Sequence, residues 1–182
     1  MRVSQSLNLW VKTFRAFRLD EESFRIRGFR SNDLNRVKDI NLECLPENYS
    51  SFFYRDLYRR FPETFLVAEA DGDIQGYIMC RIERGLSKLK TLRPARQCHV
   101  VSIAVREAYR RRGIATALIT RAMERGMENY NASECFLEVR MTNNAAISFY
   151  EKLGFSKAKR NFGYYMDGED AWVMAVAIEK FK

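Results

Sequence analysis

Hydrophobic residues recur along the chain in short blocks, and their spacing alternates between the period of helices and that of strands. In the first half this pattern predicts three strands and two helices, which are strand 24–29, helix 32–44, helix 52–61, strand 64–70 and strand 74–82. Pro46 and Pro62 end the two helices, because proline cannot continue an α-helix. Asp71-Gly72-Asp73 joins the last two strands, which should therefore pair antiparallel.

The middle of the chain predicts the centre of a sheet. Residues 99–105 are apolar after His99 except for Ser102, as expected of a strand covered by helices on both faces. The next block, 114–130, has the period of a helix, and 136–140 returns as a strand. A right-handed parallel crossover follows from this order. The stretch 85–97 holds several basic residues around one proline and is predicted to be a loop.

The C-terminal part predicts one more helix and two strands. The helix, 145–153, is capped by Thr142 or Asn143 and is closed by a glycine. The two strands flank the turn 167–170. Strands that alternate with helices in this way are typical of one α/β domain.

Composition narrows the class of protein. The 182 residues are 47% hydrophobic, which suits one globular domain with a full core. No apolar run reaches the roughly 18 to 20 residues that span a bilayer, so we expect a soluble protein with no membrane partner. The four cysteines lie far apart without a Cys-x-x-Cys pair, so we expect reduced thiols, no metal site and a cytoplasmic location.

Residues 1–23 form an N-terminal extension of different character. They are basic, and no acidic residue precedes Asp20. Large apolar residues lie at helical spacing in this segment, namely Leu7, Trp10, Phe14 and Phe17. Three interpretations stay open: an amphipathic accessory helix, a disordered segment and a targeting segment.

The turn between the middle strand and the long helix is the most informative segment. Arg110, Arg111 and Arg112 precede Gly113 and Ala115 there. Small residues let the backbone approach a bound group, and a helix N-terminus offers unpaired N–H donors, so the turn predicts a cradle for an anion such as pyrophosphate. A plain turn with solvated arginines is the alternative. The net charge of +8 likewise favours phosphate-rich ligands, RNA or acidic peptides, while the fingerprints of NAD and ATP sites are absent from the sequence.

Two short motifs stand at a fixed separation, and they are Arg110-x-x-Gly113-x-Ala115 and Asn143-x-x-Ala146-x-x-x-Tyr150. The first resembles the acetyl-CoA pyrophosphate loop of the GNAT superfamily. The second, with the Gly-Phe that follows it, resembles the second CoA-facing helix of that superfamily. Two such motifs together are more specific than either alone.

Four further stretches extend the resemblance, and they are 45–49, 99–105, 137–140 and 163–171. Their combination is similar to the protein N-terminal (α-amino) acetyltransferases, in particular catalytic subunits of the NatA type and their archaeal stand-alone relatives. The resemblance implies a single α/β GNAT domain over 24–182, with a mixed central sheet of about six to seven strands flanked by about four helices.

The resemblance also implies ligands and the residues that bind them. Acetyl-CoA is the expected cosubstrate, with no metal, and the expected acceptors are protein N-termini that begin with Ser, Ala, Thr, Gly or also Met. Acetyl-CoA is expected to contact Ile103, Ala104, Val105, Arg110, Arg111, Arg112, Gly113, Ile114, Ala115, Thr116, Asn143 and Tyr150. The peptide is expected to contact Leu45, Glu47, Tyr49, Tyr164 and Tyr165.

The chemistry requires a neutral amine and a proton for the departing thiolate. A peptide α-amino group has a pKa of about 7.7 to 8.0, so a modest base is enough. His99 and Glu138 lie on adjacent parallel strands and could share a water chain as that base, while Glu47 could receive the ammonium and Tyr150 could protonate the thiolate. The alternatives are a histidine satisfied in the core and a Glu138 that pairs with Arg140.

Rival functions use the same features. One is acetylation of lysine or of a small-molecule amine, and the other is a non-catalytic protein that binds CoA or the ribosome. Direct attack in a ternary complex is favoured over an acetyl-cysteine intermediate, because Cys98 and His99 are consecutive strand residues that point to opposite faces. The basic surface also allows ribosome association. The pattern does not choose among a free-standing subunit, a homo-oligomer and a complex with an auxiliary subunit.

Overall fold

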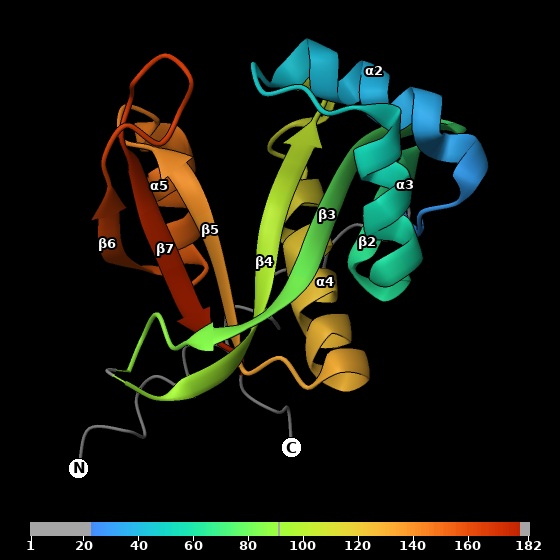
Figure 1. The fold of residues 1–182 in the computed structure, drawn as a ribbon. Helices are drawn as coiled ribbons and strands as arrows, with labels where there is room; N and C mark the ends of the chain where they lie inside the picture. Colours follow the sequence, from blue (N-terminus) through green and yellow to red (C-terminus); the bar gives the residue numbers. More distant parts are fainter. Residues whose placement is uncertain (1–22, 91, 179–182) are drawn as a thin grey trace.

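The computed structural model describes residues 23–90 and 92–178, which form a seven-stranded mixed sheet with helices on both faces (Figure 1). The strands are β1 (Arg25–Gly28), β2 (Phe65–Ala70), β3 (Asp73–Leu86), β4 (Pro94–Val105), β5 (Glu134–Arg140), β6 (Ser156–Asn161) and β7 (Ala171–Ala177). The helices are α2 (Leu34–Cys44), α3 (Ser51–Arg60), α4 (Ile114–Tyr130) and α5 (Asn144–Lys152). The predicted α/β class is confirmed. The predicted extension is residues 1–23, and all of it except Ser23 lies outside the described residues.

The strand order β1-β2-β3-β4-β5-β7-β6 explains the mixed character of the sheet. β4 and β5 pair parallel, as the crossover through α4 requires, and the other neighbours pair antiparallel. The predicted hairpin at 71–73 is confirmed, because Asp71 and Gly72 both have positive φ between β2 and β3.

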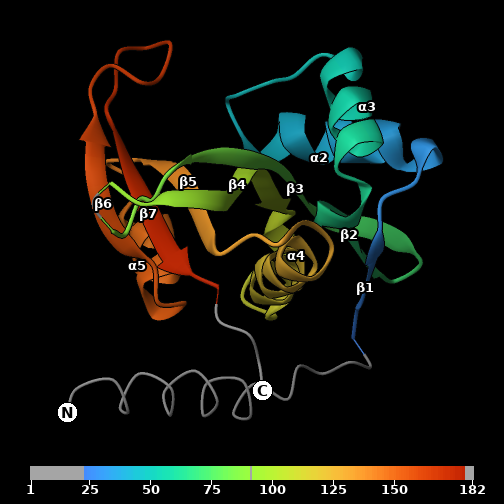
Figure 2. The ribbon, with the colours of Figure 1, turned by 60° about the horizontal axis from the view of Figure 1, so that its bottom comes forward.

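Two hydrophobic cores lie on opposite faces of the sheet (Figure 2). α4 and α5 cover one face, where Leu118 and Ile119 are fully buried, and α2 and α3 cover the other, where Val37 and Ile40 are fully buried. Each such side chain stabilises the fold by about 1.5–3 kcal/mol relative to an exposed one. Among the described residues, no helix is long and apolar enough to cross a membrane.

The helix limits follow the local signals in the sequence. α4 has the predicted bounds, and Asn143 caps α5, its Oδ1 accepting the N–H of Ala146 at 3.0 Å. Gly154 follows α5 with a φ of 86°, a left-handed conformation that glycine adopts without strain.

The loop predicted over 85–97 is wrong for most of its length. β3 continues to Leu86 and β4 begins at Pro94, so the two strands pair through most of this stretch and only 87–93 connects them. Buried Glu134 of β5 accepts hydrogen bonds from the Lys88 N–H at 3.0 Å and from Gln97 at 3.2 Å, which holds the end of this hairpin. The many basic residues of this stretch suggested a loop, but the stretch includes the paired ends of two strands.

The strands β4 and β5 part in the middle of the sheet, and this divergence positions the site (Figure 1). They pair only from Gln97 to His99, so the edge of β4 that faces β5 is unpaired beyond His99 within the described chain. A bulge adds Val101 to β4 opposite the Met79–Cys80 step of β3. Such a bulge bends a strand, and here it lies where the strands separate.

Candidate active site

The turn between β4 and α4 has the geometry of an anion site. Arg111 and Gly113 have φ of 61° and 83°, and the first helical hydrogen bond runs from the Ala117 N–H to the Gly113 carbonyl at 3.0 Å. The three preceding N–H groups have no acceptor within the helix, and they belong to Ile114, Ala115 and Thr116. Left-handed residues beside free N–H groups form a concave donor surface, and the positive end of the helix dipole adds to it.

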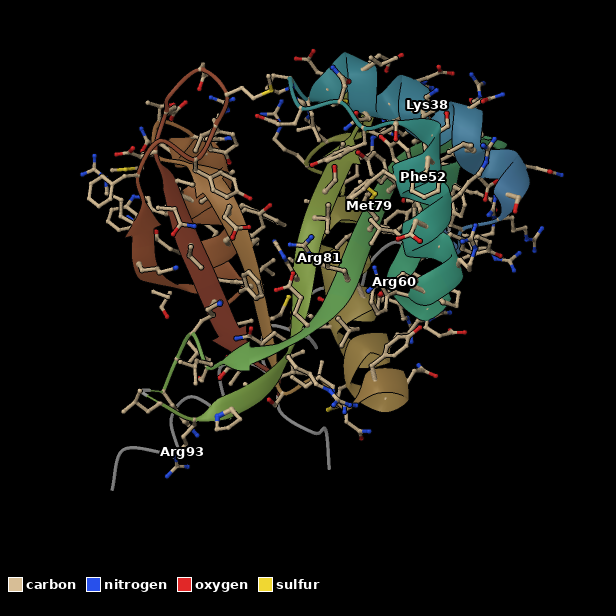
Figure 3. The ribbon with its side chains drawn as sticks, in the orientation of Figure 1. Lys38, Phe52, Arg60, Met79, Arg81 and Arg93 are labelled. Carbon is tan, nitrogen blue, oxygen red and sulfur yellow. The ribbon has the colours of Figure 1, made fainter. Side chains whose placement is uncertain are left out.

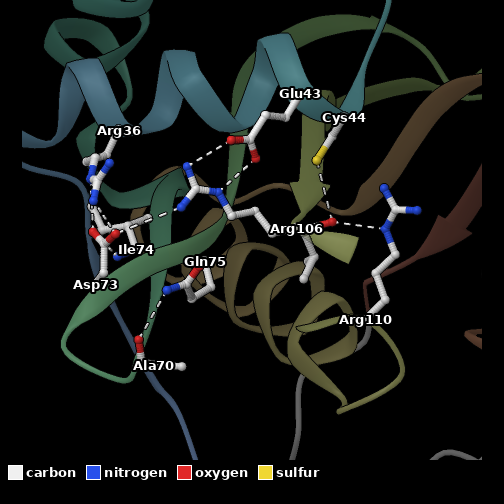
Figure 4. Close-up of polar contacts among 10 residues, drawn as sticks. Arg36, Glu43, Cys44, Ala70, Asp73, Ile74, Gln75, Arg106 and Arg110 are labelled. Carbon is white, nitrogen blue, oxygen red and sulfur yellow. Dashed lines mark hydrogen bonds and ion pairs between the residues drawn. The ribbon is translucent and has the colours of Figure 1, made fainter. Parts of the chain in front are cut away.

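The three predicted arginines have different surroundings. Arg110 folds back, and its Nε donates to the Val105 carbonyl at 3.0 Å, an oxygen that Cys44 Sγ also approaches at 3.6 Å (Figure 4). The Arg112 guanidinium lies 4.8 Å from the centre of the Tyr109 ring. Arg111 is exposed and forms no hydrogen bond or ion pair among the described residues. Arg112 likewise forms no hydrogen bond or ion pair among the described residues, so both guanidinium groups are available to an incoming anion, and that of Arg111 also has no ring contact.

Arg106 fixes the start of this turn. It donates to both carboxylate oxygens of Glu43 in α2, at 2.9 and 3.2 Å (Figure 4). The turn is thereby held to the second helical layer. The predicted backbone contacts Ile103, Ala104 and Val105 lie on the edge of β4 that β5 leaves unpaired.

Tyr150 of α5 lies in the hydrophobic core on the α4–α5 face of the sheet. It is 8% exposed and packs against Phe149 and Phe155, with ring centres 5.1 and 5.7 Å away. Burial raises the pKa of the Tyr150 hydroxyl well above its usual value, so the group stays protonated at neutral pH. A buried phenol in this state can donate a proton or a hydrogen bond.

His99 and Glu138 meet on the opposite face. His99 Nε2 lies 2.7 Å from Glu138 Oε2, and the imidazole stacks on Phe136 with ring centres 4.2 Å apart. The two side chains point into the same space, as expected, but in place of the predicted water chain they touch directly, with no room between the two atoms for a bridging water. Cys98 packs in the α4 core instead, as the strand alternation predicts.

Two residues of this cluster were not predicted. Glu83 Oε1 lies 2.9 Å from His99 Nδ1, and Arg81, which extends from β3 toward the β5 side, also contacts Glu83 and approaches Nδ1 at 3.2 Å (Figure 3). Burial pushes the pKa of the Glu83 carboxyl up, but the contacts with His99 and Arg81 outweigh it and hold this pKa below its usual value. Only the register Arg81↔His99 could have revealed the cluster.

Arg140 does not pair with Glu138, which removes that alternative. Its Nη2 donates to Glu47 at 2.7 Å, and its Nη1 donates to Asp167 at 2.7 Å and to Glu169 at 2.8 Å. The guanidinium also lies 3.9 Å from the centre of the Tyr165 ring. Arg140 thus connects the loop before α3 with the loop before β7.

The predicted peptide contacts lie on these two loops. Tyr49 donates from its hydroxyl to the Val101 carbonyl at 3.3 Å, and Leu45 packs against the α2–α3 core. Tyr164 is 47% exposed, and burial together with nearby Glu138 raises the pKa of its hydroxyl to about 12. The structure therefore gathers Glu47, Tyr164 and Tyr165 near the His99–Glu138 pair, whereas Leu45 is a packing residue.

Together these features supply the parts of a group transfer. One face of the divergence offers an imidazole–carboxylate pair, the other offers a protonated phenol, and the turn beside α4 offers an anion cradle. Within 23–90 and 92–178, no group of three metal-binding side chains is arranged to hold a metal ion.

Known proteins share this sequence and fold. The sequence model of the acetyltransferase (GNAT) family matches residues 34–155. Proteins named N-alpha-acetyltransferase from Sulfurisphaera tokodaii and Saccharolobus solfataricus are each 48% identical, over 86% and 84% of this chain and 95% and 92% of their own. The crystal structure of Ard1 from Thermoplasma volcanium has a TM-score of 0.75 at 30% identity, and covers 87% of this chain and 99% of its own. The chain belongs to the acetyltransferase (GNAT) family.

Proposed function

We propose that the protein transfers the acetyl group of acetyl-CoA to the free α-amino group of protein N-termini, by direct attack in a ternary complex. The observation that carries the proposal is the His99–Glu138 contact of 2.7 Å at the point where β4 and β5 part. A base formed by this pair would lie beside the unpaired edge of β4. The names of the archaeal relatives support the α-amino acceptor.

Acetyl-CoA would bind along the turn and the open edge of β4. Its pyrophosphate oxygens would accept hydrogen bonds from the free N–H groups at the start of α4, with Arg111 as a nearby unpaired cation. The pantetheine arm would pair with the backbone of Ile103 to Val105 as an added strand. This places the thioester between Tyr150 on one face and His99 on the other. Asn143 would contribute through its amide N–H₂, since its oxygen caps α5.

The acceptor amine would lie against the two loops that Arg140 connects. One carboxylate oxygen of Glu47 is bound by Arg140, which leaves the other for the substrate ammonium. The Glu138–His99 pair would take the proton of this ammonium, and the amine would then attack the thioester carbonyl. As the carbon–sulfur bond breaks, the Tyr150 hydroxyl would give its proton to the thiolate. The new amide nitrogen then loses a proton, and this proton would restore the Tyr150 hydroxyl.

The preferred acceptors would be small first residues, Ser, Ala, Thr or Gly, with Met as a further acceptor. The rings of Tyr49, Tyr164 and Tyr165 would hold the first peptide residues. A cytoplasmic setting agrees with the free thiols of the described chain. The net charge of +8 would also favour contact with ribosomal RNA, and salt-dependent cosedimentation with ribosomes tests that association.

Mass spectrometry tests the reaction itself. A Ser-initiated peptide with one internal lysine is incubated with acetyl-CoA and the protein, beside the same peptide with a blocked N-terminus. We expect acetylation of the free α-amine alone. Acetylation of the lysine in both peptides would instead show a lysine acetyltransferase, and the absence of any product would favour a non-catalytic CoA-binding protein.

A further inference from the structure

His99 is held between two carboxylates, and only one of them is explained by the reaction. Glu138 lies at Nε2, on the side of β5, while Glu83 lies at Nδ1, on the side of β3. The Glu138 side chain is 12% exposed, that of His99 is 8% exposed, and that of Glu83 is 32% exposed. Glu83 is thus the outer member of a line of three groups.

The contacts decide which imidazole nitrogen carries the proton. A carboxylate only accepts hydrogen bonds, so Nδ1 must carry a hydrogen in order to bond Glu83 at 2.9 Å. Arg81 Nε also lies within hydrogen-bond distance of Nδ1, at 3.2 Å, but its contact with Glu83 Oε1 is closer. The same rule applies to Nε2, which lies 2.7 Å from Glu138, so a neutral ring satisfies both contacts only when Glu138 carries a proton and donates it to Nε2. The contact with Arg81 favours the ionised form of Glu83, so in that state the ring hydrogen is on Nδ1 and the lone pair is on Nε2.

We propose, on the basis of the proposed function, that Glu83 is a positioning residue for His99. It selects the tautomer whose Nε2 can take a proton from Glu138, and its negative charge stabilises the imidazolium that results. The proton that the ammonium gives up is then held between Glu138 and His99 while the amine attacks. The same division of roles is found wherever a carboxylate orients a histidine base.

Arg81 makes the role of Glu83 necessary. Without the Glu83 carboxylate, the nearest acceptor for the Arg81 Nε–H is His99 Nδ1, at 3.2 Å. That hydrogen bond would fix the opposite tautomer, with the hydrogen on Nε2 and no lone pair toward Glu138. Other groups face this cluster less closely: Tyr49 and Tyr164 approach Glu138, and Lys88 lies over Phe136 beneath the imidazole. These groups stay unchanged when Glu83 is replaced.

The test is a double-mutant cycle with Glu83→Ala and His99→Phe, measured as kcat/KM for the Ser-initiated peptide. Glu69→Gln is the matched control, because Glu69 is also a strand carboxylate paired with an arginine and is 35% exposed. We expect Glu83→Ala to lower kcat about tenfold, which is part of the roughly 10²–10⁴-fold that general-base catalysis supplies, and to leave acetyl-CoA binding unchanged. In the His99→Phe background it should cause no further loss, because it acts only through the imidazole.

Two further readouts separate positioning from a purely structural role. The acidic limb of the pH profile of kcat/KM should move to lower pH in Glu83→Ala, because a charge that favours the imidazolium is gone. Formate should restore part of the rate in this variant but not in Glu83→Ala/His99→Phe, with chloride at equal ionic strength as control. Additive losses in the cycle, with an active wild-type protein, would overturn this role alone. An inactive wild-type protein would overturn both this role and the proposed function.

Discussion

At the scale of single residues, the proposed base and the proposed cofactor site lie apart, so their roles can be tested separately. The pair lies on the face opposite α4, whereas the anion cradle lies in the turn before α4. Phenylalanine keeps the flat stack on Phe136, and glutamine keeps the shape of Glu138. We expect His99→Phe and Glu138→Gln each to lower kcat by about 10²-fold, as the loss of a general base does.

Isothermal titration supplies the complementary measurement for these two variants. Acetyl-CoA should bind each of them within about twofold of the wild-type Kd, because an interaction made only during the reaction changes kcat alone. Weaker acetyl-CoA binding with normal kcat would contradict the assignment.

The Arg140 guanidinium contacts both the loop before α3 and the loop before β7. Its removal would leave Glu47, Asp167 and Glu169 without their shared partner and would release the Tyr165 ring. For Arg140→Met we expect kcat/KM for the peptide to fall about fivefold, since a partly exposed ion pair contributes roughly 1 kcal/mol.

Arg160→Met is the matched control for Arg140, because Arg160 pairs with Asp170 beside the same loop and does not touch Glu47. Steady-state kinetics with varied peptide should separate the two variants. An equal loss in both would mean that the loop as a whole, and not the position of Glu47, limits the reaction.

At the scale of elements, α4 connects the fold to the cofactor. Gly113 is the N-cap residue of this helix, and Arg111, which has no side-chain partner among the described residues, precedes the unpaired N–H groups. We expect Arg111→Glu to weaken acetyl-CoA binding about tenfold, because a charge-assisted hydrogen bond contributes roughly 1.5–3 kcal/mol and a like charge repels the anion. Arg121→Glu, farther along α4 and 58% exposed, should bind acetyl-CoA normally.

The elements also show what the sequence could and could not predict. α4 was predicted with its bounds because its apolar period is long and Gly113 begins it. The stretch 85–97 was mispredicted because basic residues hide a strand pair that is fixed by contacts elsewhere, at Glu134. Local patterns report local structure, and pairing between distant segments leaves no such pattern.

The same difference between local and long-range pairing decides which site residues could be predicted from the sequence. His99 and Glu138 could be matched because both lie on strands with a predictable parallel relation. Glu83 and Arg140 could not, since their partners are set by the register between β3 and β4 and by two loops. The sequence predicts the groups that we propose to react, and the structure adds the groups that contact them.

At the scale of the whole molecule, ion pairs make stability depend on pH. Burial pushes the pKa of Asp33 up, but hydrogen bonds from Arg27 and from the Arg30 N–H outweigh it, so this pKa is lowered in the fold. Several other carboxyls have lowered pKa values in the fold, namely Glu83, Asp167, Glu169 and Asp170. Each of these groups binds a proton more weakly in the folded chain than in the unfolded one.

The sign of the pH dependence follows from this difference. A carboxyl with a lowered pKa contributes its full stability above its unfolded pKa, about 3.9 for aspartate and 4.3 for glutamate. The contribution is lost as the pH falls through the folded value, because both states are then protonated. Urea unfolding should therefore give a free energy of unfolding that is steady at neutral pH and falls below about pH 5. Asp33→Asn should be less stable at pH 7 and should show a shallower fall in acid.

Arg27→Met provides the other half of this test. Arg27 is the cation that holds both Asp33 and Glu69, so its removal should flatten the same acidic fall while leaving both carboxyls in place. At a pH below the folded pKa values, Asp33→Asn should approach the wild-type stability, because a protonated aspartic acid carries no charge for Arg27 to stabilise. The difference in the free energy of unfolding between Asp33→Asn and the wild-type protein could instead stay constant from neutral to acidic pH. That result would show that Asp33 stabilises the fold through packing and not through its charge.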